Sequence, residues 1–247
     1  MTSASTFRQR TARLIPRPIM RRLRPGSIPA HGRVDLGDLR RTRPISRHFG
    51  FDRGLPIDRF YVERFLDAHR ADVQGRVLEV GDATYTKRFG EGSVARSDVL
   101  HVPPGTDEAT IVADLAAGDG IDSDAFDCVI LTQTLHLIWD FEAAVATLHR
   151  ILAPGGVLLA TVPGISQIER GQWRDTWYWS FTEQSMTRLF SDVFGSGDVQ
   201  VSAVGNALSA VAFLEGLAAD ELREHELSAT DEAYPVLVTI RAVKRQA

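Results

Sequence analysis

Runs of apolar and β-branched residues recur along the chain and predict the strands of one sheet. Five runs come first and two more lie near the end of the chain: residues 76–80, 94–99, 110–113, 128–132, 157–162, 199–204 and 236–243. The first five are mostly unbroken by polar residues, as expected of parallel strands that are covered on both faces. The pattern therefore predicts an α/β fold in which helices cover both faces of a seven-stranded, mostly parallel sheet.

Apolar residues with helical spacing lie between several of these runs. Residues 57–69 form one such pattern, and a second begins behind Asp140, a residue type that favours the N-cap position. The Pro-Gly-Gly sequence at 154–156 ends that second helix and turns the chain into the next strand. A third helix is expected behind Thr182, and an alanine-rich helical segment over 207–225 separates the last two strands.

Charge divides the chain into two parts. Residues 1–47 contain twelve arginines and only two acids, a net charge of +10, and because the whole chain carries −4 the remainder carries −14. Prolines and the lack of any sustained period predict an irregular basic arm over 1–47. The rest is expected to form one domain with a helical lead-in, a core, a helical insert and a last strand: residues 48–247, divided into 49–75, 76–204, 206–227 and 235–244.

Composition narrows the classes of partner and compartment. The acidic domain disfavours nucleic acid because it would repel phosphate, although the arm either lies against the domain or contacts nucleic acid or a membrane surface. Cys128 is the only cysteine, so no intramolecular disulfide is possible, and we expect a soluble, cytoplasmic protein. No apolar stretch is long enough to span a membrane. Histidines and the cysteine lack the spacing of metal ligands, so no metal is expected.

Polar residues stand at the ends of the predicted strands, where ligands bind in open α/β sheets. Glu79 and Gly81 end the first strand, and a glycine there permits a sharp backbone turn beneath a ligand. Asp98 lies seventeen residues after Gly81, near the offset at which a carboxylate binds ribose hydroxyls in dinucleotide sites. Asp114 and Leu115 follow the third strand. This order predicts a nucleotide-like cofactor that lies across the strand ends.

Together these pieces resemble the class I S-adenosylmethionine-dependent methyltransferases, in the branch described as type 11. The motifs are RVLEVGD, ADL, FDCVILTQ and LAPGGVLLATVPG, at residues 76–82, 113–115, 126–133 and 152–164. The resemblance implies a Rossmann-like methyltransferase fold and S-adenosylmethionine as cofactor. It implies cofactor-binding roles for Glu79, Gly81, Asp82, Asp98, Asp114, Leu115, Thr132 and Gln133. The chain departs from the family pattern at Ala83 and Tyr85, which stand where the second and third glycines are expected.

Groups that bind the methyl acceptor are expected outside the sheet. Residues 51–66 and 177–190 resemble segments of bacterial methyltransferase-domain proteins that accompany glycosyltransferases and other polysaccharide or natural-product enzymes. Aromatic faces with charged groups nearby suit a sugar or a flat ring. The candidate substrate-binding residues are Arg53, Asp58, Tyr61, Tyr85, Trp177 and Trp179.

Methyl transfer from a sulfonium needs mainly alignment, and a base only where the acceptor must lose a proton. His136 is the candidate catalytic base, because it follows the fourth strand and its ordinary pKa is near neutrality. The sequence thus predicts a methyltransferase that acts on a hydroxyl of a small-molecule, saccharide or natural-product acceptor. An inactive methyltransferase-fold binding or partner protein is the alternative. The helical segment at 207–225 either caps the acceptor pocket or makes a homodimer contact.

Overall fold

The computed structural model describes residues 28–246, and the chain divides into two compact units, 1–42 and 43–247. In the first unit, the described part contains a short 3₁₀-helix over Gly37–Leu39. The start of the second unit is fixed by hydrogen bonds across a large sequence separation, because the N–H groups of Ile45 and Ser46 both donate to Glu215. Most of the predicted basic arm, residues 1–27, lies outside the described residues.

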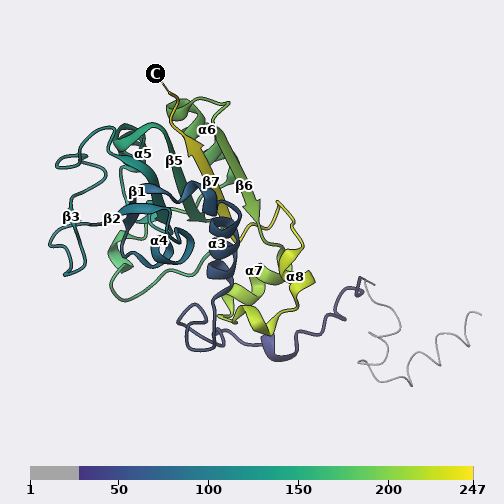
Figure 1. The fold of residues 1–247 in the computed structure, drawn as a ribbon. Coiled ribbons are helices and arrows are strands. Elements are labelled where there is room, and N and C mark those ends of the chain that lie inside the picture. The colour runs from purple at the N-terminus through teal and green to yellow at the C-terminus, as the bar shows by residue number, and fades with distance from the viewer. Residues whose placement is uncertain (1–27, 247) are drawn as a thin grey trace, which may run out of the picture. The chain divides into compact units, whose positions relative to one another are not determined.

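The second unit contains a seven-stranded sheet in the order β3-β2-β1-β4-β5-β7-β6 (Figure 1). Strands β1 to β5 pair in parallel, and β7 is antiparallel to both β5 and β6. The strands are β1 (Gly75–Val80), β2 (Val94–His101), β3 (Ile111–Val112), β4 (Phe126–Thr132), β5 (Leu152–Pro163), β6 (Val199–Val204) and β7 (Leu237–Val243). This arrangement confirms the predicted mostly parallel α/β sheet.

The α-helices of the described residues are α3 (Ile57–Ala68), α4 (Thr84–Phe89), α5 (Phe141–Ile151), α6 (Glu183–Phe194), α7 (Ala207–Leu214) and α8 (Glu224–Ser228). The side chain of Asp140 accepts from the Ala143 N–H at 3.1 Å and begins α5, and Thr182 caps α6 in the same way. The alanine-rich segment forms α7 and α8 rather than one helix, because Gly216 adopts a φ of +71° just after α7. Within residues 28–246, every helix is too short or too polar to cross a membrane.

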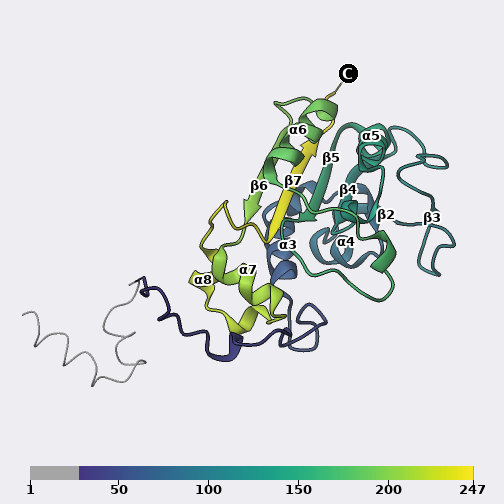
Figure 2. The same ribbon diagram turned by 180° about the vertical axis from the view of Figure 1, so that it is seen from behind.

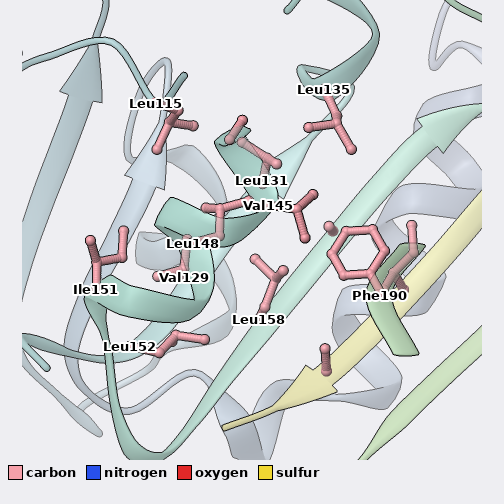
Figure 3. Packing of buried hydrophobic residues seen from close by; sticks show 14 of the residues in the cluster. Leu115, Val129, Leu131, Leu135, Val145, Leu148, Ile151, Leu152, Leu158 and Phe190 are labelled. Carbon is pink, nitrogen blue, oxygen red and sulfur yellow. The ribbon is translucent and has the colours of Figure 1, made fainter. Parts of the chain in front are cut away.

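Alternate residues of the central strands enter two separate cores, one on each face of the sheet. Val129 and Leu131 of β4 pack with α5 and α6, and Figure 3 shows this core with Leu148 and Phe190. On the other face, Cys128 and Ile130 of β4 pack with residues of α3 and α7. The two opposite views show these helix layers on either side of the sheet (Figures 1 and 2). Burial on both faces holds the strand ends in fixed register, and these ends build the site.

Candidate active site

A cavity of about 1030 Å³ opens where β1, β2, β4 and β5 reach their C-terminal ends. Its wall includes residues from these strand ends, from α3 and from the long connection between β5 and α6. Ligand sites of small molecules have volumes of roughly 300 to 1,000 Å³, so the cavity has room for a nucleotide-like cofactor together with an acceptor. Its position agrees with the rule that ligands bind outside the carboxyl ends of strands in open α/β sheets.

The end of β1 turns under the cavity around a buried carboxylate. Glu79 is 3% exposed and accepts from the N–H groups of Tyr85 at 3.1 Å and Thr86 at 2.7 Å. Burial raises the pKa of Glu79, and these hydrogen bonds partly offset the rise. Gly81 adopts a φ of +103°, and a Cβ placed on it would meet no atom within 4 Å. The turn therefore presents bare backbone to open space, as close approach of a ligand requires.

The two departures from the glycine pattern are compatible with this turn. Ala83 has a φ of −115° and precedes the first residue of α4, and Tyr85 lies within that helix. Neither backbone is in the left-handed region that favours glycine. Tyr85 instead lines the cavity, where burial raises the pKa of its hydroxyl and the nearby Arg59 opposes the rise. The turn keeps its geometry without the second and third glycines.

Several further predicted cofactor residues line the same cavity. Asp114 is exposed, and its carboxylate accepts from the Ala116 N–H at 2.8 Å, whereas its neighbour Leu115 is packed into the core. Both follow β3. Asp82, Thr132 and Gln133 also line the cavity, at the ends of β1 and β4. The structure thus brings together seven of the eight predicted cofactor residues: Glu79, Gly81, Asp82, Asp114, Leu115, Thr132 and Gln133.

Asp98 does not line the cavity, so the interpretation of this residue as the ribose ligand is not supported. Its side chain is 1% exposed and accepts from Arg76 at 2.8 Å, from Arg96 at 3.1 Å and from Thr110 at 3.0 Å. Burial pushes the pKa of Asp98 upward, but these hydrogen bonds outweigh it and leave the pKa below its ordinary value. Strand β2 continues for three residues beyond Asp98, to His101. The carboxylate is therefore a structural group within the strand.

His136 lies in the cavity wall and is only 2% exposed, yet neither ring nitrogen has a hydrogen-bond partner within residues 28–246. It belongs to a 3₁₀-turn over Leu135–Leu137 that follows β4. Burial, helped by the positive charge of Arg59, lowers the pKa of His136 to about 4. The Trp177 ring lies 4.4 Å from the imidazole, centroid to centroid. A neutral imidazole with free nitrogens is therefore available to a ligand at neutral pH.

A second buried polar group lies on the same wall. Asp58 of α3 is 7% exposed, and its Oδ2 accepts from Gln133 at 3.4 Å and lies 4.0 Å from the Arg59 guanidinium. Oδ1 of Asp58 and Oε1 of Gln133 have no partner among the described residues. Burial raises the pKa of Asp58, with Arg59 opposing the rise. Buried polar atoms are almost always paired, so these orphaned atoms indicate a ligand site.

The predicted substrate-binding residues divide evenly. Asp58, Tyr85 and Trp177 line the cavity, whereas Arg53, Tyr61 and Trp179 do not, so their assignment as acceptor ligands is not supported. Arg53 is paired with Glu221, the Tyr61 hydroxyl donates to the Leu227 carbonyl at 2.9 Å, and the Trp179 indole donates to the Ile138 carbonyl at 3.1 Å. These three side chains therefore stabilise the fold through contacts within the protein.

Aromatic residues that were not predicted complete the wall. Phe49, Phe51 and Trp139 line the cavity, and Phe49 stacks on Trp177 with centroids 6.1 Å apart. The FGF sequence before α3 is the feature that could have predicted Phe49 and Phe51 as site residues. Trp139 is exposed and immediately precedes Asp140, the N-cap of α5. Within residues 28–246, no group of three or more His, Cys, Asp or Glu side chains is arranged to hold a metal ion.

The lowered pKa of His136 makes the free energy of unfolding depend on pH. The unfolded chain takes up this proton near pH 6.5, but the folded protein does so only near pH 4, so acidification across this window favours unfolding. Between pH 7.5 and pH 5 the wild type should lose about 2 kcal/mol more unfolding free energy than His136→Gln. Denaturant titrations of both proteins at the two pH values measure this difference. Equal losses would show that the ring titrates normally.

The strand order, the antiparallel β7 and the cavity at the ends of the parallel strands together define a Rossmann-like class I methyltransferase fold. A family model described as a methyltransferase domain matches residues 57–193, and the chain belongs to this family. The cofactor of this family is S-adenosylmethionine. No match was found among curated proteins.

Solved structures share the fold at low sequence identity. An S-adenosylmethionine-dependent methyltransferase from Archaeoglobus fulgidus is 10% identical over 75% of this chain and 93% of that chain, with a TM-score of 0.50. The cyclase SpnF is 16% identical over 76% and 81%, with a TM-score of 0.50. A phosphoethanolamine N-methyltransferase from Haemonchus contortus, solved with S-adenosylmethionine, is 14% identical over 77% and 57%, with a TM-score of 0.47.

Proposed function

We propose that the protein transfers the methyl group of S-adenosylmethionine to a hydroxyl of a small-molecule or saccharide acceptor. The observation that carries this proposal is His136, a buried, neutral imidazole in the cavity wall whose two nitrogens have no partner in the part of the chain that the structure describes. A sugar or phenolic hydroxyl loses its proton as it is methylated, and a neutral imidazole accepts it. The reaction therefore has a group of the required chemistry in the same cavity as the cofactor residues.

The residues at the strand ends fit the cofactor. The open backbone at Gly81 leaves room for the methionine part, and Glu79 holds the turn beneath it. Asp114 supplies a carboxylate oxygen for the adenine amino group, with Leu115 beside the ring. Thr132 and Gln133 lie at the end of β4, where the cofactor and acceptor meet. When bound, S-adenosylmethionine supplies an already activated methyl group.

The protein's own contribution is then positioning and exclusion of water. Asp58 and Gln133 offer unpartnered oxygens that accept from acceptor hydroxyls. Trp177 and Phe49 offer apolar faces on which a sugar or flat ring packs. His136 holds the acceptor hydroxyl by a hydrogen bond and takes its proton. These roles align the nucleophilic oxygen without a charged base in the ground state.

The charge of the cavity favours a neutral acceptor over an anionic one. Among the lining residues Arg59 is the one arginine or lysine, whereas seven are acids: Asp58, Glu63, Glu79, Asp82, Asp114, Asp140 and Glu169. A phosphate or carboxylate on the acceptor would be repelled by this field. Neutral glycosides and phenolic natural products are therefore better candidates than sugar phosphates.

The second candidate is a protein of the same fold that binds a ligand or partner without transferring a methyl group. It is favoured by Tyr85, a residue of the cavity wall that stands where the family pattern has a glycine. A tyrosine leaves less space than a glycine for a cofactor beside the turn that follows β1. The two candidates differ in one measurable property, because only the first requires binding and turnover of S-adenosylmethionine.

Calorimetric titration tests the proposal. S-adenosylmethionine and S-adenosylhomocysteine should bind with dissociation constants of about 1–100 µM. NAD should not bind, because the turn after β1 lacks the glycine fingerprint of dinucleotide sites. Labelled methyl transfer to neutral glycosides and phenols should follow. Binding of neither adenosyl compound would exclude the methyltransferase. Binding without transfer to any hydroxylated acceptor would favour the non-catalytic protein.

A further inference from the structure

The end of β2 offers one hydrogen-bonding side chain to the cavity. Leu100, His101 and Val102 line it there, and the first and third are apolar. Val80 pairs with Leu100, and the Gly81 N–H donates to the Leu100 carbonyl at 3.0 Å. His101 therefore lies in the cavity wall one residue beyond the partner of Val80, on the side toward β3, where it pairs with Val112.

The hydrogen bonding of His101 leaves one ring nitrogen ready to accept. Nδ1 lies 3.0 Å from the Val102 carbonyl oxygen. Because a carbonyl oxygen can only accept, Nδ1 carries the proton and Nε2 carries the lone pair. A hydroxyl of a ligand is a suitable donor to that nitrogen. The contact with Val102 also fixes the tautomer and limits rotation of the ring.

The position of His101 is the one at which a carboxylate normally binds ribose. In dinucleotide sites this acid lies about twenty residues beyond the glycine turn, at the end of the second strand. His101 lies twenty residues after Gly81, at the last residue of β2. Asp98, the nearest acid earlier in the strand, is already occupied by Arg76, Arg96 and Thr110. The side chain at the usual position of the ribose-binding carboxylate is thus an imidazole.

We propose that His101 binds a ribose hydroxyl of S-adenosylmethionine, accepting through Nε2 in place of a carboxylate. This inference rests on the proposed cofactor site. A carboxylate has two oxygens and accepts from both ribose hydroxyls, whereas neutral imidazole accepts from one. His101 should therefore bind the ribose more weakly and less selectively than a carboxylate at the same position would. Restoring an acid at this position should strengthen cofactor binding.

Calorimetry with the full-length protein tests the proposal without relying on turnover. The probes are S-adenosylhomocysteine and its analogue that lacks both ribose hydroxyls. The wild type should bind the natural compound about fivefold more tightly than the analogue, the effect of one ordinary hydrogen bond. His101→Ala should bind both compounds equally, at the affinity of the wild type for the analogue. His101→Asp should bind the natural compound more tightly than the wild type does.

Two further variants separate ribose binding from folding. His101→Asn keeps a side-chain acceptor and should retain part of the discrimination between the two compounds. His225→Ala removes an exposed imidazole on α8, outside the cavity, and should bind both compounds like the wild type. If His101→Ala, folded by thermal melting, still discriminates fivefold, the inference is overturned and another group of the cavity binds the ribose. If the wild type binds neither compound, the proposed function fails together with it.

Discussion

Replacing His136 by glutamine should lower kcat about 10²- to 10⁴-fold, while the affinity for S-adenosylhomocysteine stays within twofold of the wild type. The expected loss is that of removing a positioned proton acceptor. The cofactor affinity should persist, because His136 lies in the wall beside Trp177 rather than at the β1 turn. Steady-state rates with an accepted glycoside or phenol, and calorimetry with S-adenosylhomocysteine, measure the two quantities separately.

The pH dependence of the rate is a second test of the role of His136. Because burial and Arg59 lower the pKa of His136 to about 4, the neutral ring is present throughout the range above about pH 5. The acid limb of kcat/KM that depends on His136 should therefore lie near pH 4 and be absent from His136→Gln, because kcat/KM reports the pKa of the free enzyme. His48→Gln, at an exposed position outside the cavity, should match the wild type. A His136→Gln enzyme with wild-type kcat would remove the imidazole from the mechanism.

The elements that the sequence predicted well are those whose signals are local. Asp140 and Thr182 lie at the N-caps of α5 and α6, and the periodicity behind each residue gives the buried face. Strand β6 runs over 199–204, the predicted range, because its ends coincide with its apolar pattern. The six-residue helix α4 was not predicted, since the N–H groups at its start are held by Glu79 from the preceding strand rather than by a cap of its own.

The site was predictable as far as strand ends determine it. Glu79 and Asp114 line one cavity because parallel strands bring their carboxyl ends to the same edge. The offset from Gly81 did not identify a cavity residue at Asp98. The offset predicts only that Asp98 lies near the end of a strand, and it does not show that β2 extends to His101. The contact of Phe49 with Trp177 joins segments far apart in the sequence, and no local pattern encodes that meeting.

Glu79→Ala should lower the unfolding free energy by about 3 kcal/mol and weaken S-adenosylmethionine binding at least tenfold. The N–H groups of Tyr85 and Thr86 would lose their acceptor inside the protein, and the missing side chain would leave a void. The raised pKa of Glu79 shows that its burial already opposes ionisation, and relief of that cost reduces the loss. Denaturant titration measures the first effect and calorimetry the second.

The two effects have one cause, because the side chain that holds the start of α4 also fixes the backbone at Gly81. Glu79→Gln keeps one acceptor oxygen and should fall between the wild type and Glu79→Ala in both measurements. Glu91→Ala removes an exposed acid near Arg70 and should change stability by less than about 0.5 kcal/mol. Loss of stability without loss of cofactor affinity in Glu79→Ala would separate the turn from the binding site.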